Sequence, residues 1–89
     1  MSLDRQTIEE TIKNKVVDIA EALGSDARNL HVEEVIPSTG LIDSAALIEL
    51  LMWYENFYQI QLAEEEITID NLGSIAAMAT FVLRRKGLL

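Results

Sequence analysis

GLIDSAALIEL, residues 40–50, passes from turn-forming to helix-forming residues at one point, between Asp43 and Ser44. Aspartate is favoured as a helix N-cap because its carboxylate accepts hydrogen bonds from the free backbone N–H groups of the first turn. Beyond this point apolar residues recur at spacings of three or four, which is typical of a helix with one buried face. We therefore predict a helix from about Ser44 to Tyr58. Its expected inner face consists of Leu47, Leu50, Leu51, Tyr54 and Tyr58.

The residues before this helix form a long connection. Turn-forming residues stand near both of its ends, as GSD at 24–26 and PSTG at 37–40, and apolar residues lie between them. Those apolar residues would hold the segment against a core. We expect an ordered loop over residues 24–43 with one short helical turn, and loops of this length in small domains are often functional.

Two further helices are predicted on either side. Residues 4–23 repeat apolar side chains at helical spacing, with Asp4 as the N-cap and Gly24 as the terminator. The expected inner face consists of Ile8, Ile12, Val16, Ile19 and Leu23. The last helix begins after Ser74 and stops at Gly87, with short turns expected at 63–66 and 69–72. Its expected inner face consists of Ile75, Met78, Ala79 and Val82.

These elements predict an all-α fold: a small three-to-four-helix bundle with a long ordered loop between the first two helices. At 89 residues, the chain is expected to form a single domain over residues 1–89. It contains no cysteine and one histidine, His31, which excludes a cysteine nucleophile and metal sites built from several Cys or His residues. No glycine-rich phosphate loop occurs. We expect neither a catalytic residue nor a metal site, so the chain is not predicted to be an enzyme.

The net charge of -8 disfavours nucleic acids and anionic membranes as partners. No apolar run approaches the roughly 18 residues that a membrane helix needs. The first ten residues do not have the pattern of a signal peptide. A cytoplasmic protein without membrane insertion is therefore expected.

Ser44 is the residue whose position points most specifically to a chemical role. Its hydroxyl is expected to be exposed at the end of the long loop and at the positive end of a helix dipole, where a phosphate ester would be favoured. An Asp-Ser pair alone usually reflects only how helices begin. The wider context therefore has to decide between the two interpretations.

That context resembles the acyl and peptidyl carrier proteins. In this family a Gly-Leu-x-Asp-Ser run, here GLIDS at 40–44, leads into the second helix. ENFYQIQL at 55–62 looks like the family's Glu-x-x-Phe-x-Ile-x-Leu close of that helix. EEEIT at 64–68, followed by NLGSI at 71–75, is similar to the acidic third segment and the start of the last helix. The likeness covers about residues 38–83, and its pieces occur in the family's order and spacing.

The resemblance implies a 4'-phosphopantetheine arm, taken from coenzyme A and attached covalently to Ser44, with Asp43 in a supporting role. The implied partners are a phosphopantetheinyl transferase, an acyl- or aminoacyl-loading ligase, and a downstream acyltransferase or synthase. The protein would hold its cargo as a thioester and act as a monomer. The expected partner-facing surface consists of Ala45, Ile48, Glu49, Met52, Glu55 and Asn56.

Three departures from the family pattern point to a specialised stand-alone carrier. Ala45 replaces the usual Leu or Met after the serine, and Trp53 and Phe57 stand where small or charged residues are common. The second helix also has fewer acids than in fatty-acid carriers. Acyl, aminoacyl, D-alanyl, peptidyl and polyketide cargo all remain open. The alternative is a helical protein–protein interaction module in which Ser44 is not modified.

Overall fold

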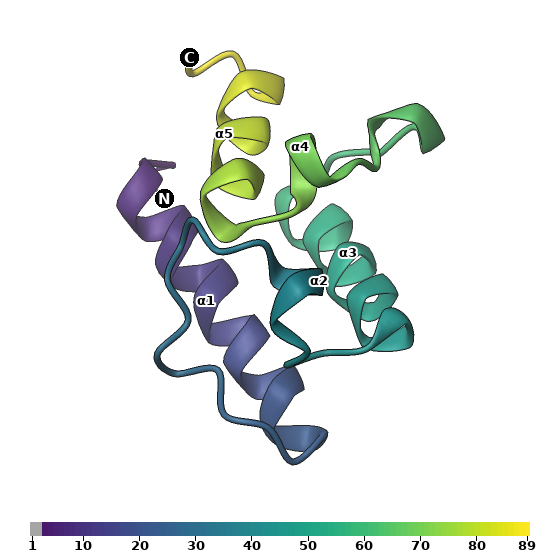
Figure 1. The fold of residues 1–89 in the computed structure, drawn as a ribbon. Coiled ribbons are helices and arrows are strands. Elements are labelled where there is room, and N and C mark those ends of the chain that lie inside the picture. The colour runs from purple at the N-terminus through teal and green to yellow at the C-terminus, as the bar shows by residue number, and fades with distance from the viewer. Residues whose placement is uncertain (1–2) are drawn as a thin grey trace.

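The computed structural model describes residues 3–89, and this part of the chain is helical without any β-strand (Figure 1). The predicted all-α class and small-bundle architecture are confirmed. The helices are α1 (Arg5–Ala22), α2 (Ile36–Thr39), α3 (Ser44–Tyr58), the 3-10 helix η1 (Glu64–Glu66), α4 (Ile69–Leu72) and α5 (Ile75–Arg85). Within the described residues, three long helices are joined by short ones: α2 lies between the first two long helices, and η1 and α4 lie between the last two.

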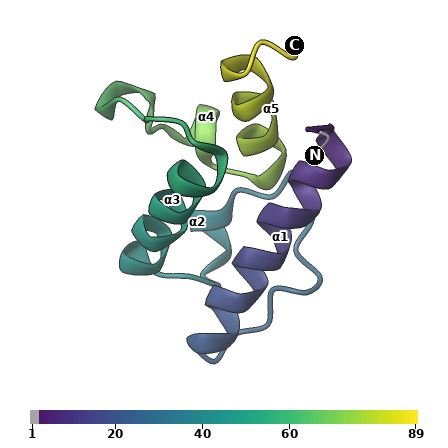
Figure 2. The ribbon, with the colours of Figure 1, turned by 180° about the vertical axis from the view of Figure 1, so that it is seen from behind.

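The core lies where the three long helices meet. α1 packs against both α5 and α3, and α4 packs against α5 (Figures 1 and 2). Each buried aliphatic side chain contributes on the order of 1.5–3 kcal/mol relative to exposure, so this shared interior is the main stabilising term. Its fully buried large side chains are Ile8, Ile12, Val16, Ile36, Leu50, Tyr54, Ile75, Met78 and Val82.

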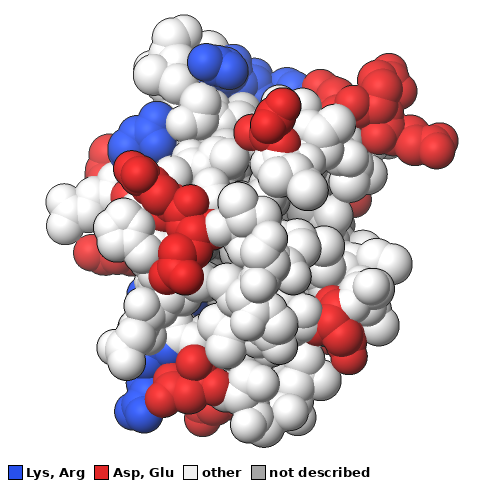
Figure 3. Space-filling view, in the orientation of Figure 1, with Lys and Arg blue, Asp and Glu red and all other residues white. Residues whose placement is uncertain are grey.

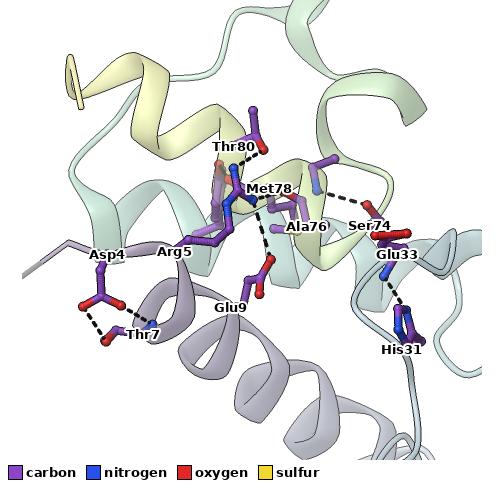
Figure 4. A network of polar contacts seen from close by, with 12 residues as sticks. Asp4, Arg5, Thr7, Glu9, His31, Glu33, Ser74, Ala76, Met78 and Thr80 are labelled. Carbon is purple, nitrogen blue, oxygen red and sulfur yellow. Dashed lines mark hydrogen bonds and ion pairs between the residues drawn. The ribbon is translucent and has the colours of Figure 1, made fainter. Parts of the chain in front are cut away.

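Polar contacts reinforce the packing of the long helices. Arg5 lies between α1 and α5, where it donates to the Thr80 hydroxyl at 2.8 Å and pairs with Glu9 at 3.6 Å (Figure 4). The Tyr54 hydroxyl of α3 donates to the backbone carbonyl of Met78 in α5 at 2.8 Å. Burial raises the pKa of Tyr54 above its ordinary range, because the protein interior disfavours the phenolate.

The helix boundaries follow the predicted caps. α3 spans Ser44–Tyr58 as expected, and Asp4 caps α1 by accepting from the backbone N–H of Thr7. One predicted core residue is wrong: Leu23 is 47% exposed, whereas Ala20 is fully buried. The reason is local, because Leu23 is the C-cap of α1 and Gly24 then turns the chain with a φ of 82°.

The long loop is ordered and contains α2 as its one helical turn. Two backbone hydrogen bonds tie it to the junction of α4 and α5: Ile36 N–H to Gly73 O at 2.7 Å, and Ala76 N–H to Val32 O at 2.8 Å. Gly73 is required at this junction, since a Cβ there would lie 2.4 Å from the carbonyl oxygen of Ile69. The loop is therefore positioned by residues some 40 positions later in the chain.

The segment from α3 to α4 projects from the body of the molecule (Figures 1 and 2). Gln59 ends α3 in the left-handed region with a φ of 53°. Arg85 holds the projection from α5, donating to the carbonyl of Gln61 at 2.7 Å and pairing with Glu66 at 2.6 Å. The short turn expected at 63–66 is present as η1.

Candidate functional site

Ser44 is the first residue of α3, and its side chain is exposed. Asp43 precedes it in an extended conformation, with φ of -91° and ψ of -178°. The Asp43 carboxylate accepts from the backbone N–H of Ala46 at 2.8 Å, and its backbone carbonyl accepts from Leu47 N–H at 2.9 Å. Asp43 thus fixes the first turn of the helix on which Ser44 stands.

The turn before Asp43 is held by one hydroxyl. Thr39 Oγ1 donates to the carbonyl of Ile36 at 2.7 Å and accepts from the backbone N–H of Leu41 at 3.2 Å. Between these two residues the chain reverses at Gly40, whose φ of 72° favours glycine. Ile42 is then buried at 6% exposure. Ser44 consequently follows a chain segment that is anchored on both sides of the turn.

A groove of about 270 Å³ lies beside Ser44 and is lined by Pro37, Ile42, Asp43, Ser44 and Leu47. An apolar cavity of about 130 Å³ lies between α2, α3 and α4, and its lining includes Pro37, Leu47, Leu51 and Ile69. Pro37 and Leu47 border both hollows. Leu47 and Leu51, predicted to face the core, are only partly buried because they form this wall. Pro37 was not among the predicted site residues, because its position depends on the fold of the loop.

The outward face of α3 carries most of the predicted partner surface. Ile48 is 60% exposed and Met52 is 58% exposed, and Ala45, Glu49 and Asn56 are exposed around them. These five residues are called the α3 outer face below. Glu55 is only partly exposed, and its carboxylate accepts from the backbone N–H of Leu62 at 2.8 Å. Glu55 therefore has a structural contact within the protein, and its role in partner binding stays a prediction.

An aromatic pair lies on the flank of α3 that faces α1. The rings of Trp53 and Phe57 are 5.1 Å apart, and the Lys15 ammonium of α1 lies 6.0 Å from the Trp53 ring. Trp53 is partly buried, whereas Phe57 is 48% exposed. Trp53 therefore packs largely within the protein, and Phe57 adds apolar surface next to the α3 outer face.

The charges are separated along the chain in a way that the net charge alone does not reveal. No Lys or Arg occurs between Arg28 and Arg84, so α2, α3, η1 and α4 carry no basic side chain. The same stretch carries nine acids: Glu33, Glu34, Asp43, Glu49, Glu55, Glu64, Glu65, Glu66 and Asp70. In Figure 3, the basic residues gather at the α5 end and along the side of α1. The surroundings of Ser44 would therefore attract basic partners.

The Ser44 hydroxyl has no activating base within the described residues. No described side chain makes a hydrogen bond to it, and His31 is engaged in its own turn, where its Nδ1 accepts from Glu33 N–H at 3.2 Å (Figure 4). Nucleophilic catalysis by this chain would need such a base.

The described residues fit a phosphopantetheine group at Ser44. The hydroxyl is exposed, the helix N-terminus favours a phosphodiester charge, and the neighbouring groove gives the first part of an attached chain somewhere to lie. Within residues 3–89, no three His, Cys, Asp or Glu side chains gather as metal ligands. None of the described helices has the length and apolar content needed to cross a bilayer.

Comparison with known proteins gives no relative: no family model, no curated protein and no solved structure matches this chain.

Proposed function

We propose that the protein is a stand-alone carrier that receives a 4'-phosphopantetheine arm on Ser44 and presents the attached cargo to partner enzymes. One observation carries the proposal: an exposed serine hydroxyl stands on the first residue of a 15-residue helix whose cap is the preceding aspartate. The resemblance of residues 38–83 to carrier proteins supports the same reading. We further propose that the protein works as a monomer in the cytoplasm.

The attachment is a phosphoryl transfer carried out by a phosphopantetheinyl transferase with coenzyme A as the donor. The Ser44 oxygen forms a bond to the phosphorus that bears the pantetheine, and the bond from that phosphorus to the adenosine bisphosphate leaving group breaks. The serine proton is released to a base of the transferase or to solvent. When attached, the group supplies the thiol that this cysteine-free chain lacks.

This chain's contribution is to hold the acceptor oxygen in place. Asp43 fixes the first turn through Ala46 N–H, and the positive end of the α3 dipole favours the phosphodiester charge that forms at Ser44. Residues 29–83 contain no Lys or Arg, so the segments on either side of Ser44 in the sequence supply no basic side chain. Additional cations would come from the partner.

The α3 outer face is the proposed contact surface for the transferase, for the ligase that loads acyl or aminoacyl cargo, and for the downstream acyltransferase or synthase. Its two large apolar residues, Ile48 and Met52, lie on the same helix as Ser44, and the exposed acid Glu49 stands beside them. A small apolar centre with a charged rim suits brief, salt-sensitive contacts. Cargo transfer requires contacts of this kind, because the carrier has to leave each partner.

The test is to incubate the protein with coenzyme A, Mg²⁺ and a phosphopantetheinyl transferase of broad specificity, and to record the intact mass. The wild-type chain is expected to gain one phosphopantetheine, and Ser44→Ala to gain none. If the folded wild-type protein gains no mass with several transferases, the carrier proposal is wrong.

The second candidate is an interaction module without modification, favoured by the exposure of Ile48 and Met52 whatever the state of Ser44. The two candidates differ in what Ser44→Ala does. A module would keep its partner in pull-down experiments after this substitution. A carrier would keep its transferase contact but lose every partner that recognises the arm.

A further inference from the structure

A hollow of about 400 Å³ is built into the long loop and is separate from the groove at Ser44. Its lining consists of Asn29, Leu30, Glu34, Val35, Ser38, Thr39 and Leu41. Leu30 is buried at 5% exposure and forms an apolar base, while Asn29, Glu34 and Ser38 are exposed at the rim. This arrangement places apolar and hydrogen-bonding groups in the same hollow.

Several polar side chains that line the hollow have hydrogen-bond donors or acceptors that are not used within the protein. Within residues 3–89, the side chains of Asn29 and Ser38 make no hydrogen bond, and only one oxygen of Glu34 is engaged, by His31 N–H at 2.7 Å. Thr39 is different, because its hydroxyl is already used on both sides of the Gly40 turn. A ligand with amides could therefore bind donors and acceptors here that the protein does not satisfy itself.

We propose that this loop hollow is the resting site of the pantetheine portion of the arm, which deepens the proposed function and rests on it. Pantetheine combines a branched aliphatic carbon, a hydroxyl and amides, so it matches a lining that has an aliphatic base and a polar rim. The apolar cavity between α3 and α4 matches less well. It measures about 130 Å³, and its one polar side chain, Thr68, already accepts from Asn71 N–H.

Because the arm would be attached covalently at Ser44, weak binding to the hollow is sufficient to hold it there for much of the time. Leu41 lines the hollow and stands three residues before Ser44, so their Cα atoms are at most about 11 Å apart at 3.8 Å per residue. The extended arm is longer than this span. A short flexible tether gives an effective concentration of the order of millimolar, so a site with a Kd of about 1 mM would be filled for about half of the time.

The expected consequence is a carrier that shelters its arm between partners. The loop hollow lies on the chain segment that leads into Ser44 rather than on the α3 outer face. A partner could therefore dock on α3 while the arm is still at rest, and then draw the arm out into its own active site.

The experiment compares backbone amide NMR shifts of the full-length protein before and after attachment of the arm. In the wild-type chain, attachment is expected to shift the amides of Leu30 and Val35, which are distant from Ser44 in sequence. The variants Ser38→Trp and Asn29→Trp each place a bulky ring at the rim of the hollow, and both residues are exposed. Each variant is expected to accept the arm normally but to lose the shifts at Leu30 and Val35.

Ile67→Trp is the matched control, because it narrows the apolar cavity from a position that is also exposed and should leave those shifts unchanged. The inference is overturned if attachment shifts only residues adjoining Ser44, or if the shifts gather around Ile67 and Leu72 and vanish in Ile67→Trp. Failure of the wild-type chain to accept any arm is a separate result, seen in the mass spectrum, and would overturn the carrier function and this inference together.

Discussion

Asp43 and Ala46 are joined across the first turn of α3 by a hydrogen bond of 2.8 Å from the Ala46 backbone N–H to the Asp43 carboxylate. This contact makes the residue before Ser44 the cap of the helix that presents Ser44. The stability of α3 and the presentation of Ser44, the proposed acceptor, therefore depend on the same side chain.

Substitutions at Asp43 test its effect on the stability of α3 and its effect on the presentation of Ser44 by two different measurements. Asp43→Ala is expected to lower the free energy of unfolding by about 1 kcal/mol, the usual effect of losing an N-cap. Asp43→Asn keeps a capping oxygen and should retain most of that stability. Urea denaturation measures the stability, and the rate of arm attachment measures presentation. Equal stability of the Ala and Asn variants would contradict the capping role.

Thr39 is predicted to position the loop that leads to Ser44. Thr39→Val keeps the shape of the side chain but removes its bonds to Ile36 and Leu41, so a loss of about 1–2 kcal/mol in unfolding free energy is expected. The turnover number for arm attachment should fall more than the KM changes. Thr39→Ser, which restores the hydroxyl, should recover both quantities. A Ser variant that behaves like the Val variant would show that the hydroxyl does not matter.

Gly73 is predicted to be intolerant of any side chain. In Gly73→Ala the new Cβ would meet the carbonyl oxygen of Ile69 at 2.4 Å, and relief of that clash would disturb the hydrogen bond from Ile36 N–H. A cost of about 1–3 kcal/mol is expected from such overpacking. Thermal unfolding provides the measurement, with Gly24→Ala as a comparison that strains φ but meets no neighbour within 4 Å. A melting temperature of Gly73→Ala equal to that of the wild type would refute the close contact.

Tyr54 is predicted to stabilise the pairing of α3 with α5 through its hydroxyl. Tyr54→Phe leaves the packing intact but removes the hydrogen bond to Met78 O, which should lower the free energy of unfolding by about 1 kcal/mol. Phe57→Leu, at an exposed position on the same helix, should change it much less. Denaturation curves of the two variants, recorded side by side with the wild type, give the two changes in the free energy of unfolding that are compared.

Glu66 gives the projecting segment a predicted dependence on pH. The pKa of its carboxyl lies below the ordinary 4.5, first because of the hydrogen bond from Ala63 N–H and then because of Arg85. A carboxylate with a depressed pKa in the folded state stabilises the fold above its unfolded pKa, and this effect is lost as pH falls through the folded value. Glu66→Gln should therefore unfold at a lower temperature than the wild type at pH 7. The difference should disappear at pH values well below 4.5, and a difference that persists there would contradict this account.

The sequence predicted correctly those structural features whose physical cause lies within a few neighbouring residues. Asp43 as a cap and the apolar repeat behind it predicted the bounds of α3, because capping and periodicity act within a few residues. The exposure of Leu23 was missed, because helical periodicity does not show that a residue at the last position leaves the helical path. The loop hollow and the shared wall at Pro37 could not be predicted. They depend on the contact between Ile36 and Gly73, which are far apart in the sequence and are joined only by the tertiary fold.

The position of the modification tests the central claim most directly. Trypsin leaves residues 29–84 in one piece, with Ser38, Ser44 and Ser74 together, whereas a protease that cleaves after glutamate releases residues 35–49. After treatment with coenzyme A, Mg²⁺ and a transferase, fragmentation of the 35–49 peptide in the mass spectrometer is expected to place one phosphopantetheine on Ser44, with Ser38 unmodified. An arm on Ser38 or Ser74, or no arm on any serine of the folded protein, would contradict the account.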